Sequence, residues 1–158
     1  MYDDPLEAHQ TAASLLYRYA TSLDDGPLAH WPRCFTEAGH YRLIPRENFL
    51  QGVPVALLHC TSRAAMEERV KALYRVQATV PYACRHLYTN VLVEQGSPGR
   101  VLLRANYAVY HTVDEGEVDL LSVGRLEAQV LLRPEALFER MDVIFEMCRL
   151  SGTHVYPL

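Results

Sequence analysis

Hydrophobic residues recur at three- and four-residue steps near the start of the chain, with polar residues between them. This spacing places the apolar side chains on one face of a helix, so the pattern predicts an amphipathic helix from Leu6 to Leu23. The stretch Asp24-Asp25-Gly26-Pro27 should end it, because glycine provides a helix exit and proline blocks continuation. The apolar and semi-apolar positions are Ala12, Leu15, Leu16, Tyr19, Ala20 and Leu23.

A corner rich in glycine, proline and aromatic residues follows this helix. It holds the only tryptophan of the chain, Trp31, and Phe35 four positions later. We expect a short helix that opens at Gly26-Pro27 to wedge both rings under a sheet, since proline is well tolerated in a first helical turn. Glu37-Ala38-Gly39 should then turn the chain into a strand over residues 40–45.

Three weaker patterns follow the corner. Residues 46–54 carry charge, a glycine and flanking prolines, which favours a loop. The short apolar run of residues 55–60 favours a strand. Thr61 or Ser62 can cap a second helix, whose apolar positions keep one face until Pro81 ends it.

In the second half of the chain the hydrophobic period changes from about 3.6 to 2. Four strand-like segments result, and the turns between them contain Gly-Ser-Pro-Gly, Asp-Glu-Gly-Glu and Arg-Pro-Glu. Such short connections allow only antiparallel neighbours. Helices followed by a long antiparallel sheet predict an α+β domain whose sheet curls around the helices. The segments are Cys84–Glu94, Arg100–Val113, Glu117–Leu132 and Ala136–Cys148.

Composition narrows the class of protein further. The length of 158 residues predicts one domain spanning residues 1–158. A net charge of -4 argues against a nucleic-acid partner, and no apolar run approaches the ~20 residues of a membrane span. The acidic start does not resemble a signal peptide, and the four scattered cysteines contain no C-x-x-C pair, so we expect a cytoplasmic protein with free thiols.

Six short motifs occur in order along nearly the whole chain. They are Tyr19–Asp24, Trp31–Glu37 with Tyr41-Arg42 after it, Asn48–Gly52, Arg85–Val91, Gly124-Arg125 and Pro157-Leu158. With this order and spacing the sequence resembles the small, or β, subunit of the aromatic-ring-hydroxylating dioxygenases, which are Rieske non-haem iron oxygenases. Within them it is similar to the salicylate, terephthalate and benzoate branch.

The resemblance implies a fold, partners and a role. The fold would be an NTF2-like or SnoaL-like cone, with N-terminal helices packed on a long curved antiparallel or mixed sheet. The chain would be a structural, non-catalytic subunit that assembles catalytic α subunits, typically as α3β3 with β–β contacts, for hydroxylation of an aromatic carboxylate. The [2Fe-2S] Rieske cluster and the mononuclear Fe(II) would belong to the α subunit, and NAD(P)H would act through a separate reductase.

Metal ligation by this chain itself is not predicted. Cys84-Arg85-His86 matches half of a Rieske ligand set, but the cluster needs a second Cys and His pair, and no cysteine occurs between Cys84 and Cys148. A mononuclear iron site needs two histidines and a carboxylate, and the seven histidines show no H-x-x-x-H or H-x-x-E pairing.

An alternative function remains open from the residues alone. A stand-alone SnoaL-like isomerase, dehydratase or hydrolase would use an acid–base pair inside the cone. Strand parity cannot place all the candidate side chains on one inward face. The candidates are Tyr41, His86, Tyr107, Asp119 and Asp142.

Tyrosine and arginine usage favours a protein that binds other subunits. The chain has ten tyrosines against four phenylalanines, and tyrosine and arginine are enriched at interfaces. The apolar ending of residues 151–158 predicts that this tail is docked against protein, and its last four residues are expected to matter for assembly. The interface candidates are Trp31, Arg85, His86, Tyr88, Arg125, Tyr156 and Leu158.

Overall fold

The fold is built from a few helices and one long sheet. The computed structural model describes residues 4–77, 83–112, 116–148 and 155–158. In chain order the elements are α1 (Pro5–Asp24), η1 (Leu28–His30), η2 (Pro32–Cys34), β1 (Phe35–Pro45), α2 (Arg46–Gln51), β2 (Leu58–Cys60), α3 (Arg63–Gln77), β3 (Cys84–Gln95), β4 (Arg100–Thr112), β5 (Val118–Leu131) and β6 (Leu137–Cys148).

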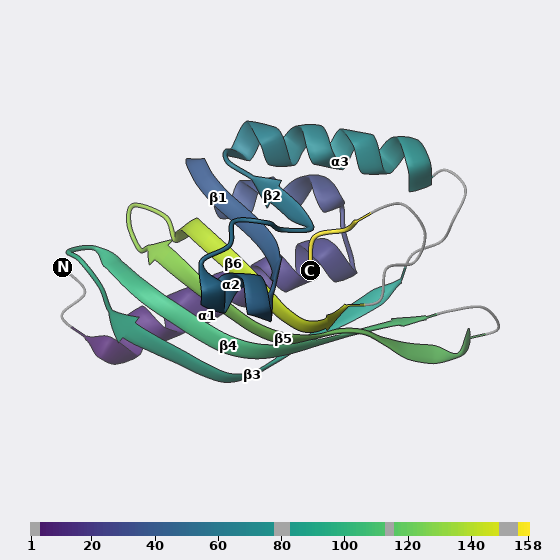
Figure 1. Cartoon of the computed structure of the whole chain (residues 1–158). Coiled ribbons are helices and arrows are strands. Elements are labelled where there is room, and N and C mark those ends of the chain that lie inside the picture. Colours follow the sequence, from purple (N-terminus) through teal and green to yellow (C-terminus); the bar gives the residue numbers. More distant parts are fainter. Residues whose placement is uncertain (1–3, 78–82, 113–115, 149–154) are drawn as a thin grey trace.

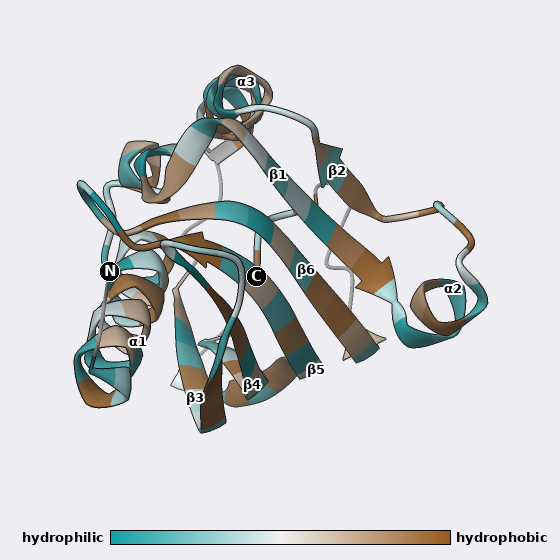
Figure 2. Cartoon of the chain, turned by 90° about the vertical axis from the view of Figure 1, so that its left-hand side faces the viewer, coloured by the Kyte–Doolittle hydropathy of each residue, from teal (hydrophilic) through white to brown (hydrophobic). Residues whose placement is uncertain are grey.

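The strands form one mixed six-stranded sheet in the order β2-β1-β6-β5-β4-β3. The strands β3 to β6 make the antiparallel meander that the period-two segments predict, and β1 adds in parallel to β6. Apolar and polar bands alternate along the strands, as Figure 2 shows. One face of the sheet therefore packs on the helices, and the α+β prediction is confirmed.

The first helix agrees with the periodicity. Asp4 caps α1 by accepting a hydrogen bond from the amide of Leu6 at 2.9 Å, and Gly26, with a φ of +69°, lies just past its end. The helix runs across the sheet and packs mainly on β3 (Figure 1). Leu15, Leu16 and Tyr19 are fully buried on its inner face.

The corner places its two rings in the core, as expected. Trp31 and Phe35 are fully buried, and the Trp31 ring meets Tyr41 edge to face at a centroid distance of 5.2 Å. The helix is replaced by two 3₁₀ turns, and Phe35 already belongs to β1. The predicted turn at Glu37-Ala38-Gly39 is wrong: β1 is bulged there, and a Cβ on Gly39 would lie 2.8 Å from the Cβ of Phe35.

After the corner, one local prediction is wrong and another is confirmed only in part. Residues 46–51 are helical rather than a loop, because Pro45 holds extended backbone before the helix and Gly52 ends it in the left-handed region, with a φ of +68°. A helix of six residues is too short to show a hydrophobic period. Of the run 55–60, residues 58–60 form the strand β2, which pairs with β1.

The remaining helix and the cysteines follow the predictions. The hydroxyl of Ser62 accepts from the amide of Ala65 at 3.1 Å and caps α3. Met66, Val70 and Leu73 are buried on one face of this helix, whereas the stop expected at Pro81 lies outside the described residues. All four cysteines lie in described segments, and none of them forms a disulfide there. Among the described helices, none is both long and apolar enough to span a membrane.

Candidate functional site

Tyrosine hydroxyls gather inside the curve of the sheet. The rings of Tyr19 from α1 and Tyr41 from β1 are fully buried, and Tyr107 from β4 is nearly so. Ser122 donates to the carbonyl of Met147 at 2.9 Å, so the hydroxyl of Tyr107, also 2.9 Å away, donates to Ser122. Burial raises the pKa of all three tyrosines, which keeps these hydroxyls neutral.

A second buried polar group joins the end of α1 to the start of β3. The Asp24 carboxylate accepts from the ring Nδ1 of His86 at 2.6 Å and from the backbone amide of His86 at 2.9 Å. The thiol of Cys84 donates to the same carboxylate at 3.4 Å. The side chain of His86 is fully buried and that of Asp24 is 8% exposed. We call these three residues, Asp24, Cys84 and His86, the Asp24 cluster; it is largely buried, and Asp24 and Cys84 line a pocket beside it.

Hydrogen bonding sets the state of the Asp24 carboxyl. Burial would raise its pKa, but the hydrogen bonds from the ring and the backbone amide of His86 outweigh burial and lower the pKa. An ionised carboxylate can only accept hydrogen bonds, so Nδ1 of His86 carries the proton. Nε2 of His86 is buried and has no protein partner among the described residues.

The donor chemistry of the Asp24 cluster fits neither iron group of a Rieske oxygenase. A Rieske cluster takes two cysteines and two histidines, and the mononuclear site takes two histidines and a carboxylate. The Asp24 cluster supplies one histidine, one cysteine and one carboxylate. Among the described residues, these are the side chains that come close enough together to be considered as a set of three metal ligands.

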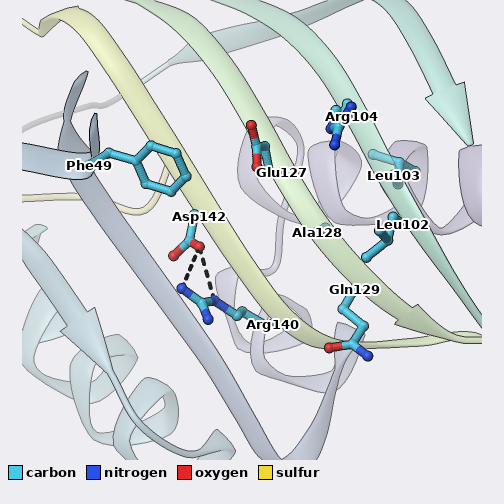
Figure 3. A pocket seen from close by; sticks show the side chains of 9 residues that line it. All are labelled: Phe49, Leu102, Leu103, Arg104, Glu127, Ala128, Gln129, Arg140 and Asp142. Carbon is cyan, nitrogen blue, oxygen red and sulfur yellow. Dashed lines mark hydrogen bonds and ion pairs between the residues drawn. The ribbon is translucent and has the colours of Figure 1, made fainter. Parts of the chain in front are cut away.

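The outer face of the sheet carries a network of ion pairs instead. Asp142 on β6 is 4% exposed and accepts from Arg42 at 2.6 Å and from Arg140 at 2.9 Å. Beside it lies a shallow pocket of about 310 Å³ over β4, β5 and β6 (Figure 3). Phe49 of α2 lines one side of this pocket. The guanidinium carbon of Arg125 lies over the Phe49 ring, 5.9 Å from the ring centroid.

The structure separates the predicted acid–base candidates. Tyr41, His86 and Tyr107 face the interior of the cone, whereas Asp142 lies on the outer face and Asp119 is exposed at the start of β5. Asp24, the partner that His86 does have, was missed because its position suggested only a helix stop. No local pattern links Asp24 to His86, because they lie on α1 and β3, which are far apart in the sequence and meet only in the folded protein.

The interface candidates also divide between surface and interior. Arg85 is exposed and pairs with Asp25 at 2.6 Å, and Tyr88, Arg125 and Tyr156 are half-buried. The other candidates have buried side chains and cannot form a surface contact in this conformation. They are Trp31, His86 and Leu158.

Comparison with known proteins finds similarity to one family and to the small subunits of aromatic-ring dioxygenases. A family model described as SnoaL-like domain matches residues 4–137. The anthranilate 1,2-dioxygenase small subunit of Burkholderia cepacia is 28% identical over 142 residues, which cover 89% of this chain and 88% of that protein. Among solved structures, a β subunit assigned to an aromatic-ring-hydroxylating dioxygenase of Novosphingobium aromaticivorans is similar with a TM-score of 0.84 and 25% identity, covering 92% of this chain and 94% of that one.

A third relative has the same architecture. The β subunit of benzoate 1,2-dioxygenase from Burkholderia mallei has a TM-score of 0.74 and 16% identity, covering 90% of both chains. The resemblance that the sequence motifs suggested is thus confirmed, and so is the SnoaL-like fold.

Proposed function

This chain belongs to the SnoaL-like domain family, and we propose that it serves as the small, or β, subunit of a multicomponent aromatic-ring-hydroxylating oxygenase. Its role would be structural and non-catalytic, holding the catalytic α subunits in register. The substrate of the complex would be an aromatic carboxylate of the anthranilate, benzoate, salicylate or terephthalate type.

One observation carries this proposal. The similarity to an anthranilate dioxygenase small subunit runs over 89% of the chain, and a β-subunit structure superposes over 92% of it. The homologues therefore support the oxygenase subunit over a stand-alone SnoaL-like isomerase, dehydratase or hydrolase.

The finer assignments are part of the same proposal. We infer an α3β3 complex in the cytoplasm, in which the Rieske cluster and the mononuclear iron belong to the α subunit and electrons arrive from NAD(P)H through a separate reductase. The donor set of the Asp24 cluster supports this division, because it lacks the second histidine that each iron group requires.

We place the contact between β subunits on the outer face of β3 and β4. Four exposed apolar side chains share that face: Leu87, Leu92, Leu102 and Tyr110. The charges around them come as opposite pairs, such as Arg104 with Glu94 at 3.6 Å. An apolar surface with balanced charge suits a second copy of itself better than a partner of one charge sign.

Co-expression with the α subunit tests the proposal. The chain alone should contain no iron and hydroxylate no substrate, whereas the co-purified complex should contain iron and hydroxylate anthranilate, benzoate, salicylate or terephthalate. Turnover of a small molecule by the chain alone, or failure to bind an α subunit, would contradict it.

A charge on the proposed contact tests its location. Leu87→Glu with Leu102→Glu should lower the mass of the assembly measured by light scattering. Leu6→Glu, at a leucine of α1 that is 62% exposed and lies away from this face, is the control and should leave the mass unchanged. An unchanged mass in the double variant would place the contact elsewhere.

A further inference from the structure

The Asp24 cluster brings a nitrogen, a sulfur and an oxygen ligand together inside the protein. Cys84 and His86 are two positions apart on β3, so their side chains leave the strand on the same face. Asp24 meets them from the end of α1. Cys84 is buried, and the side chains of His86 and Asp24 are 0% and 8% exposed. The ligand atoms of these three residues all lie within 4.8 Å of one another.

The two oxygens of the Asp24 carboxylate have separate partners. Oδ2 accepts from the backbone amide of His86 at 2.9 Å, and this bond fixes the orientation of the carboxylate. Oδ1 faces both of the other ligands, with Nδ1 of His86 at 2.6 Å and Sγ of Cys84 at 3.4 Å. One oxygen is therefore aimed between the nitrogen and the sulfur, while the other anchors the group.

The spacing of the three atoms is close to that of a tetrahedral zinc site. Zinc binds oxygen and nitrogen at about 2.0–2.2 Å and sulfur at about 2.3 Å, which separates oxygen from sulfur by about 3.5 Å and oxygen from nitrogen by about 3.3 Å. The distance of 3.4 Å between Sγ of Cys84 and Oδ1 of Asp24 matches the first value. The distance of 2.6 Å between Nδ1 of His86 and the same oxygen is that of a hydrogen bond, and it must open by about 0.7 Å when a metal ion replaces the proton.

We propose that the Asp24 cluster is a zinc site, with Oδ1 of Asp24, Sγ of Cys84 and Nδ1 of His86 as protein ligands and water in the fourth position. A pocket of about 260 Å³, lined by Asp24 and Cys84 together with Tyr156, provides room for that water and a route of entry for the ion. A thiolate and an imidazole suit zinc better than magnesium or calcium, which prefer oxygen ligands.

Charge and proton balance also favour zinc. The carboxylate and the thiolate together carry two negative charges, which Zn²⁺ cancels, so the buried site becomes neutral. The Cys84 thiol gives its proton to solvent. The neutral imidazole of His86 keeps one proton, which moves from Nδ1 to Nε2. Among the described residues Nε2 has no protein partner, so no hydrogen bond opposes this change of tautomer.

Titration calorimetry of the full chain at pH 7 tests the site, with zinc chloride as the probe after treatment with a chelator and dialysis. We expect one zinc ion per chain and release of about one proton, measured by repeating the titration in buffers of different ionisation enthalpy. Saturating zinc should also raise the urea concentration at which the chain unfolds, because the ion joins α1 to β3 only in the folded state. Cobalt chloride should give the absorption bands of tetrahedral cobalt with a thiolate ligand.

A serine at Cys84 tests the ligand assignment. Cys84→Ser should abolish the thiolate band of the cobalt complex and weaken zinc binding at least about tenfold. Cys60→Ser, at another buried thiol, is the matched control and should preserve both. Asp24→Asn covers the case in which Cys84→Ser does not fold. It keeps a carbonyl oxygen but removes the charge, and it should also weaken zinc binding at least about tenfold.

Three outcomes would overturn the proposal. One is the absence of stoichiometric zinc binding, and another is binding without proton release, which would exclude the Cys84 thiol as a ligand. The third is zinc binding that survives Cys84→Ser but is lost in His59→Ala. It would place the metal on the exposed pair His40 and His59, whose ring centroids lie 6.4 Å apart. None of these measurements involves an α subunit, so their failure is distinguishable from failure of the oxygenase assignment.

Discussion

Replacing Asp24 by alanine should destabilise the protein strongly. The carboxylate is 8% exposed and accepts two hydrogen bonds from His86, at 2.6 and 2.9 Å. Hydrogen bonds to charged groups contribute about 1.5–3 kcal/mol each, and Asp24 accepts two of them from His86. We therefore expect Asp24→Ala to lower the free energy of unfolding by about 3–5 kcal/mol, because the ring and amide of His86 lose their acceptor.

Urea unfolding measures this loss. Trp31 reports the core and far-ultraviolet circular dichroism reports the helices, so coincident transitions would support two-state analysis. The matched control is Asp25→Ala at the next position. Asp25 is 58% exposed and paired with the exposed Arg85, so its loss should cost less than about 1 kcal/mol. Equal effects of the two substitutions would refute the idea that the Asp24 cluster stabilises the join between α1 and β3.

The pH dependence gives an independent check. The pKa of Asp24 is lowered in the folded protein from its ordinary value of 3.8. Its contribution to stability is therefore fully present above that value and is lost as pH falls through the lower folded pKa. Asp24→Asn should remove this contribution, so the difference in unfolding free energy between wild type and variant should narrow below about pH 4. A difference that stays constant into acid would contradict the assigned shift.

Three further predictions concern other parts of the molecule. Gly124→Ala should lower the melting temperature more than Gly52→Ala, because a Cβ at Gly124 would lie 2.1 Å from the carbonyl oxygen of Ile144, whereas a Cβ at Gly52 meets open space and adds only the strain of the left-handed φ of +68°. Equal shifts would count against the close approach of β5 and β6. Asp142→Ala should lower the free energy of unfolding in urea by about 3 kcal/mol, because Asp142 is buried and pairs with two arginines. Glu146→Ala removes an exposed ion pair and should lower it by less than about 1 kcal/mol. The reverse order would be inconsistent with the ion-pair network of the outer face. Burial raises the pKa of the Cys34 thiol to about 11, so Cys34 should react with a disulfide reagent only after unfolding at pH 8, and rapid labelling of native Cys34 would disprove this.

Local patterns predicted the long elements well. The helix of residues 6–23 and the four strands of the second half lie within a few residues of their predicted bounds, since a buried face imposes its period on any long element. Short elements were the failures. The helix of residues 46–51 has no repeat to detect, and Gly39 indicated a turn although close approach to Phe35 makes it part of a bulge.

The site was less accessible from sequence than the fold. Strand parity correctly indicated that the five acid–base candidates could not all face inward, but it could not say which would. Asp24 and His86 are 62 residues apart and meet only because α1 packs on β3. The ending of the chain was expected to dock against protein, and the structure places Leu158 inside its own core.

The sequence by itself determined the α+β class, the meander and the family, because each depends on periodicity, turn chemistry and motif order along the chain. The tertiary structure alone decided that Tyr19 and Tyr41 bind Leu158, that Asp24 pairs with His86 and that Asp142 faces outward. These contacts join residues whose distance is set by sheet curvature and helix packing, which no local pattern encodes.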